Sequence, residues 1–169
     1  HRAHAAEVAQ QASSARASQA AAMQRDLWIG HAFWVRNVVV ATFDKNEVSA
    51  KTAEQQVVAN AQAIAAAIEP FYGAAAKASL FKLLAEHYGG VKAYLVATVS
   101  ADASGQDTAM EALTSNADAI AAFLSTANPN LSKDDVAGLL LAHTSQHVGQ
   151  IQDLKSGNYE SEAKTWDQM

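Results

Sequence analysis

The sequence contains no cysteine, and it has only 2 prolines, 8 glycines and 7% aromatic residues in 169 positions. The lack of cysteine excludes disulfides, thiolate metal sites and cysteine nucleophiles. Proline and glycine are the main breakers of regular structure, so their scarcity argues against sandwiches, barrels and doubly wound sheets. No uninterrupted apolar run reaches the ~18 residues of a membrane-spanning helix, and we therefore predict no transmembrane segment.

Charged residues are also scarce, at 17% of the chain, and the net charge is -5. Lysine and arginine form no basic stripe, which argues against a nucleic-acid partner. The sequence has no glycine-rich phosphate loop, no serine nucleophile elbow and no Glu-x-x-His pair of the di-iron carboxylate bundles. These absences leave enzymatic activity without positive support and favour a binding or structural role.

Alanine, the strongest helix former, is abundant, with 39 copies in the chain. The hydrophobic content of 50% argues against a disordered chain and is enough for one core. We therefore predict a single all-α domain, an up-down bundle of four to five helices. We assign the bundle to residues 26–157, with a polar, alanine-rich segment at 1–25 that is able to form helix and a polar tail at 158–169.

Apolar residues recur at helical spacing from Leu27 onward. Turn residues interrupt this pattern at Pro70 and Gly73 and again at 128–130. The short connections between the helices favour antiparallel neighbours. The predicted helices span 27–43, 49–69, 74–100, 107–126 and 132–156, with Ser49 and Ser132 as N-caps.

The sequence also contains an apparent internal repeat with a period of 56 residues. Segment 57–101 aligns with segment 113–157 without a gap. Alanine-rich helices match one another easily, so the rarer residues are more informative. We interpret the repeat as a recurring helical hairpin, with the first helix standing for half of one. The rare residues that recur at this spacing are His31, His87 and His143, and Asn60 and Asn116.

These five polar residues all fall on the apolar stripes of predicted helices, near mid-length. In an up-down bundle they should therefore face inward at a similar height. A buried imidazole or amide without a partner costs about 1–3 kcal/mol. Burying five such groups separately, each without a partner, would therefore cost more free energy than bringing them together on one hydrogen-bond network, water or ligand.

A further histidine, His147, lies four residues after His143, on the same face of the helix. Two imidazoles at this spacing can chelate one transition ion, as in the helical zinc motif. His31 or His87 would add a third nitrogen, a ligand set that suits zinc, copper or nickel better than magnesium or calcium. We predict a metal or small-ligand site at His31, His87, His143 and His147, with Asn60, Asn116, Trp34 and Arg36 as supporting residues.

Two alternatives remain open from the residues alone. The buried histidines and asparagines could form a network that only fixes the register of the helices, with Trp34 packing in the core and Arg36 extending to solvent. The second alternative is a haem pocket, because two facing histidines and alanine-lined walls could admit a flat ring. The sequence does not identify the metal or the oligomeric state.

Five short motifs, taken in their order and spacing, resemble a poorly characterised group of exported bacterial helical proteins over residues 27–159. The resemblance implies an all-α, exported protein with recurrent inward histidine and asparagine, and it implies no particular activity; His147 lies outside the shared pattern. The first residue is His1 rather than methionine, which we interpret as a processed or trimmed chain, in keeping with a secreted, periplasmic or cell-surface protein. The motifs are Leu27-Trp28-x-x-His31-x-x-Trp34-x-Arg36, Pro70-x-Tyr72-Gly73, Asn116-Ala117-Asp118-x-Ile120-Ala121-x-Phe123-Leu124-Ser125, Asn128-Pro129-Asn130 and Leu139-x-x-x-His143.

Overall fold

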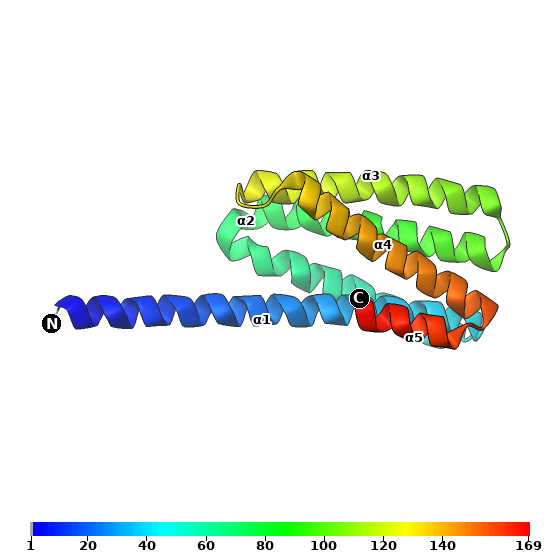
Figure 1. Cartoon of the computed structure of the whole chain (residues 1–169), viewed down its shortest axis with the longest axis horizontal. Helices are drawn as coiled ribbons and strands as arrows, with labels where there is room; N and C mark the ends of the chain where they lie inside the picture. Colours follow the sequence, from blue (N-terminus) through cyan, green and yellow to red (C-terminus); the bar gives the residue numbers. More distant parts are fainter. Residues whose placement is uncertain (1) are drawn as a thin grey trace.

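The computed structural model describes residues 2–169, and in this range it contains helices and no strands (Figure 1). The predicted all-α bundle is therefore confirmed. No helix in this range is long and apolar enough to cross a membrane. The helices are α1 (Arg2–Phe43), α2 (Glu47–Val99), α3 (Ala103–Ala127), α4 (Lys133–Ser156) and α5 (Tyr159–Gln168).

The helix boundaries follow local capping chemistry, with some corrections to the prediction. The second helix begins earlier than predicted, because the side chain of Asn46, and not of Ser49, is its N-cap and accepts a hydrogen bond from the Ser49 N–H. Asp102 caps α3 in the same way. Ser132 caps α4 as predicted, by accepting a bond from the backbone N–H of Asp135.

The turn predicted around Pro70 is a sharp kink within α2. Gly73 has φ 80° and ψ 173°, a conformation that residues with a Cβ rarely adopt. The two halves of α2, before and after Gly73, are therefore the two helices of a hairpin, and the predicted turn between two antiparallel helices lies at this kink (Figure 1).

The helices pack mostly against their neighbours in sequence, as short connections favour. α1 packs against α2, α2 against α3, α3 against α4, and α4 against α5. α4 crosses the bundle obliquely and also contacts α1 and α2, while α5 returns beside α1 (Figure 1). Residues 2–25, predicted as a separate segment, form the start of α1, which extends beyond the bundle; residues 158–169, predicted as a tail, include α5.

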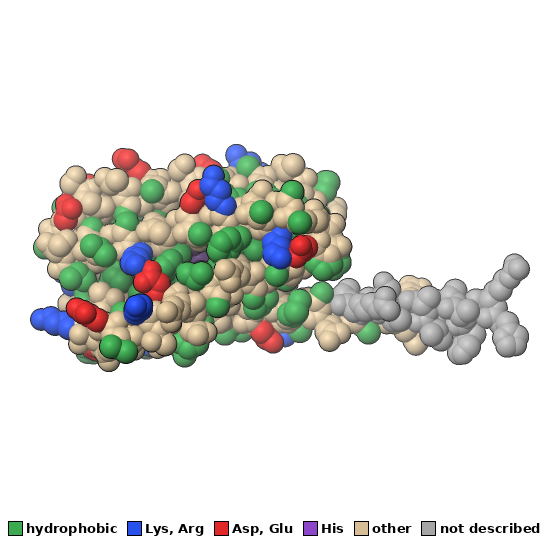
Figure 2. All heavy atoms as spheres, turned by 180° about the vertical axis from the view of Figure 1, so that it is seen from behind, with side chains coloured by type: hydrophobic (Ala, Val, Ile, Leu, Met, Phe, Trp, Pro, Cys, Tyr) green, Lys and Arg blue, Asp and Glu red, His purple; other side chains and the backbone are tan. Residues whose placement is uncertain are grey.

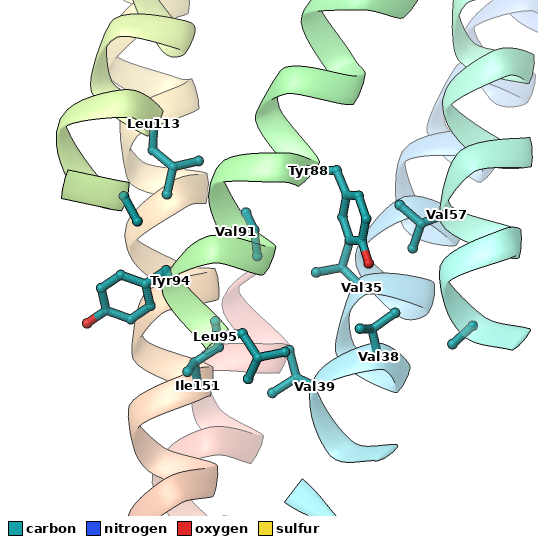
Figure 3. Packing of buried hydrophobic residues seen from close by; sticks show 12 residues of the cluster. Val35, Val38, Val39, Val57, Tyr88, Val91, Tyr94, Leu95, Leu113 and Ile151 are labelled. Atoms are coloured by element: carbon teal, nitrogen blue, oxygen red, sulfur yellow. The ribbon is translucent and has the colours of Figure 1, made fainter. Parts of the chain in front are cut away.

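Two apolar clusters fill the bundle. In the first, Val35 from α1, Val57 and Tyr88 from the two halves of α2, and Ile151 from α4 meet (Figure 3). The second joins Ile64 and other small or branched side chains of α2. On the second half of α2, His87 lies between Leu84 of the second cluster and Val91 of the first, so a polar position separates the two clusters.

Two asparagines make equivalent contacts between neighbouring helices. Asn60 Nδ2 donates to the Leu27 carbonyl oxygen at 2.9 Å, and Asn116 Nδ2 donates to the Leu83 carbonyl oxygen at 3.0 Å. Donor and acceptor are 33 positions apart in both cases. Each bond ties a helix to the preceding one; the 56-residue repeat as a whole stays a prediction.

Two adjacent glycines in α2 provide a matched test of the packing. A Cβ added at Gly90 would lie 2.8 Å from side-chain carbons of Leu113 on α3, whereas one added at Gly89 would meet nothing within 4 Å. We expect Gly90→Ala to lower the free energy of unfolding by about 1–3 kcal/mol because it overpacks the core. Gly89→Ala should raise it by about 0.5–1 kcal/mol through helix propensity. Urea unfolding of both variants measures the difference, and equal effects would contradict this packing.

Candidate metal centre

Three histidines from two helices converge inside the bundle. α1 contributes His31, and α4 contributes His143 and His147. Each offers one ring nitrogen, and these nitrogens all lie within 4.8 Å of one another. His31 and His147 are each 2% exposed, and His143 is half-buried. Accordingly, very little histidine surface is visible on the face of the molecule shown in Figure 2.

The closest pair is His143 and His147, which are one helical turn apart on α4. Their Nε2 atoms are 3.1 Å apart, so one ring donates its proton to the other. Tetrahedral coordination with metal–nitrogen bonds of about 2.0–2.1 Å separates two ligand nitrogens by about 3.3–3.4 Å. This pair is therefore already near chelating distance, and an ion could take the place of the shared proton. His31 offers a ring nitrogen within 4.8 Å of both.

The fourth predicted ligand, His87, lies beside this group. Its ring stacks on His143 with centroids 6.0 Å apart and planes at 20°, and it lies 6.5 Å from the ring of His31. Asn116 Oδ1 is 3.2 Å from His87 Nδ1, while the amide nitrogen of Asn116 is already donating to a carbonyl. The His87 Nδ1 must therefore be the donor, and its Nε2 carries a lone pair.

That Nε2 atom is buried and has no hydrogen-bond partner in the described chain. His31 Nδ1 is likewise buried without a hydrogen-bond partner in the described chain. A metal-binding histidine commonly donates one ring N–H to an oxygen acceptor, which fixes the other nitrogen as the ligand atom. Asn116 makes a bond of this kind to His87 Nδ1, and its role as the orienting residue of a metal ligand stays a prediction.

Burial keeps the imidazoles uncharged. It lowers the pKa of His31 to about 3, with further lowering by His143 and His87. Burial and the nearby His87 lower the pKa of His143 to about 4. The pKa of His147 lies well below its usual value, and that of His87 is lowered by burial although the bond to Asn116 opposes the shift. At neutral pH each ring is therefore neutral, the form that binds metals.

The remaining predicted residues do not hydrogen-bond to the imidazoles in the described structure. Asn60 binds the Leu27 carbonyl instead, and its own Oδ1 is buried without a partner. Trp34 packs against the first apolar cluster and edge-on to Phe33. The tryptophan that contacts the histidine group is Trp28, whose ring meets that of His31 edge-on with the centroids 5.9 Å apart.

Arg36 forms an ion pair with Glu162, a residue that the sequence analysis missed. Its Nε and Nη2 donate to the two carboxylate oxygens of Glu162 at 2.5 and 2.9 Å. Glu162 is 2% exposed and also accepts a bond from Gln150. The guanidinium lies 5.6 Å from the ring centroid of Trp166, which is also on α5. Arg36 therefore attaches α5 to α1, since a bidentate pair fixes both groups in orientation.

A cavity of about 550 Å³ adjoins the histidines. It lies between α1, α4 and the end of α5, and His143 forms part of its wall. Its other polar side chain is Arg25, and no aspartate or glutamate of the described chain lines it. The apolar lining residues are Trp28, Ile29, Ala32, Val136, Leu139, Leu140, Trp166 and Met169.

The arrangement as a whole is a buried group of neutral imidazoles with one ring reaching an apolar cavity. The potential ligand atoms of this group are all ring nitrogens, and no carboxylate of the described residues belongs to it. The resemblance to exported bacterial helical proteins stays a prediction. No protein-family model, no curated protein and no solved structure matches the chain.

Proposed function

We propose that this protein is a binding protein that holds one transition-metal ion at His31, His143 and His147, with His87 as a fourth ligand. The convergence of three ring nitrogens within 4.8 Å in the interior of the bundle carries the proposal. Two of these residues come from one turn of α4, and the third comes from a helix distant in sequence, so folding itself brings the ligands together.

The ligand chemistry favours zinc, copper or nickel. Imidazole is a good ligand for all three, whereas magnesium and calcium require oxygen donors. The lowered pKa values mean that no proton has to be removed from a charged ring at neutral pH. Asn116 supports the proposal by directing the Nε2 atom of His87 away from the amide.

The structural alternative is a layer of histidine and asparagine that only sets the helix register. The hydrogen bonds of Asn60 and Asn116 to neighbouring helices support such a role for the amides. It leaves the unpartnered nitrogens of His31 and His87 without an explanation, because buried polar atoms normally have partners. A bound ion accounts for them, which is why we favour metal binding.

The test is the metal content and visible spectrum of protein purified without an affinity tag. We expect about one equivalent of zinc, copper or nickel per chain, no Soret band, and loss of most of the metal in His143→Ala. Thr144→Val is the matched control, since Thr144 is buried beside His143 in sequence and provides no ring nitrogen. Protein with no stoichiometric metal, even after incubation with each ion, would contradict the proposal; a Soret band would support haem instead.

A further inference from the structure

The apolar cavity and the histidine group meet at one residue. His143 belongs to the set of converging nitrogens and also lines the cavity, and it is the least buried of the three. Trp28 and Ala32, which also line the cavity, flank His31: Trp28 contacts its ring, and Ala32 is its neighbour in sequence. The cavity is therefore the part of the surface from which a small molecule can approach the metal centre.

The positive charge at the cavity favours a negatively charged ligand. A divalent ion held only by neutral imidazoles keeps its full charge in a largely buried place, and an isolated buried charge is costly. A negatively charged donor atom would offset that cost. Arg25 adds a positive group at the same cavity, and no acidic side chain of the described chain lines it to compensate.

The apolar walls of the cavity indicate which kind of ligand body fits beside the charged donor atom. Eight of the ten lining residues are apolar, among them Trp28, Leu140 and Trp166, and a cavity of about 550 Å³ is in the range that holds small organic ligands. Leu139 and Ile29 are 72% and 58% exposed, so they offer apolar surface that a ligand would cover.

We propose that this cavity binds a small apolar carboxylate, aromatic or medium-chain, whose carboxylate oxygen coordinates the metal ion and whose apolar body lies between α1, α4 and α5. The inference rests on the proposed metal site and adds to it the ligand that the site receives. Arg25 attracts the anion, and Leu139 and its apolar neighbours select for its body.

Copper-loaded protein gives a direct test with benzoate as the probe. Its visible absorption and isothermal titration calorimetry report binding of benzoate, of acetate, which has the same donor without the ring, and of benzyl alcohol, which has the ring without the charge. We expect benzoate to bind at least about tenfold more tightly than either compound, because neither alone supplies both interactions. Metal-free protein should bind benzoate at least about tenfold more weakly.

Two variants locate the site. Leu139→Ala should weaken benzoate binding about threefold or more and leave acetate unchanged, while Leu131→Ala, a leucine outside the cavity, should change neither. Arg25→Gln should weaken the binding of both benzoate and acetate.

The outcomes separate the two proposals. If the protein binds none of copper, zinc and nickel, the metal site and this inference both fail; if it binds only zinc or nickel, the calorimetric comparison is made with that ion and decides the carboxylate site in the same way. If copper binds but benzoate and acetate are equivalent, or Leu139→Ala has no effect, only the carboxylate site is overturned. Equal benzoate affinity with and without metal would also overturn it, since coordination would then contribute nothing.

Discussion

Metal-free protein is expected to unfold on mild acidification, with most of the loss of stability between pH 6.5 and 4. In the unfolded chain the four histidines take up protons near pH 6.5, whereas burial holds their pKa values lower in the fold. The unfolded state therefore binds more protons in this range, and the free energy of unfolding falls as the pH falls. Well above pH 6.5 the histidines are neutral in both states, so stability no longer depends on these groups.

The size of the effect follows from the lowered pKa values of His31 and His143. With folded pKa values of about 3 for His31 and about 4 for His143, each ring lowers the free energy of unfolding by about 2 kcal/mol between pH 8 and pH 5. His87 and His147 act in the same direction. Since domains of this size are stable by only about 5–15 kcal/mol in total, we expect acid unfolding near pH 5.

Urea unfolding followed by circular dichroism at a series of pH values measures this loss. In His147→Leu the slope of the free energy of unfolding between pH 5 and 6 should decrease by roughly 1 kcal/mol per pH unit, because one proton fewer is taken up. Thr144→Val, a buried substitution on the same helix, should keep the slope of the unsubstituted protein. A flat profile down to pH 4.5 would mean that the histidines are not buried as described.

Zinc is expected to stabilise the protein strongly at neutral pH. An ion that binds the folded state alone stabilises it by mass action, by about 2.7 kcal/mol when free zinc is 100 times the dissociation constant. For a chain of this length that corresponds to an increase in Tm of roughly 5–10 °C. The gain should be much smaller in His147→Leu, which has lost one ligand, and should persist in Thr144→Val, and differential scanning calorimetry measures it. At pH 5 the gain should be smaller, because protons compete for the same nitrogens.

Much of the fold was predictable because alanine content and apolar periodicity are local signals. The all-α bundle and the cap at Ser132 followed from them. Residues 158–169 carry local helix signals that the prediction of a polar tail left out: Asn158 is an N-cap, and Glu160 pairs with Lys164 one turn later. The position of α5 depends on tertiary contacts, since it packs against α4 and its Glu162 pairs with Arg36, 126 positions away in the sequence.

The candidate site was predictable to a similar extent. The common spacing of His31, His87 and His143, with His147 one turn further, indicated four converging rings, and the structure brings all four together. The role of Asn60 could not be read from its stripe, because its side chain meets a backbone carbonyl of another helix. The role of Arg36 could not be predicted either, because its partner Glu162 is distant in sequence. The cavity depends on three helices and has no sequence signature.

The most direct test of the metal centre is X-ray absorption spectroscopy of the protein loaded with one equivalent of zinc. The geometry predicts three to four imidazole nitrogens at about 2.0–2.1 Å, with one imidazole fewer in His147→Leu and no change in Thr144→Val. Zinc that does not bind stoichiometrically, or that binds mainly to oxygen ligands with the same spectrum in both variants, would contradict the account.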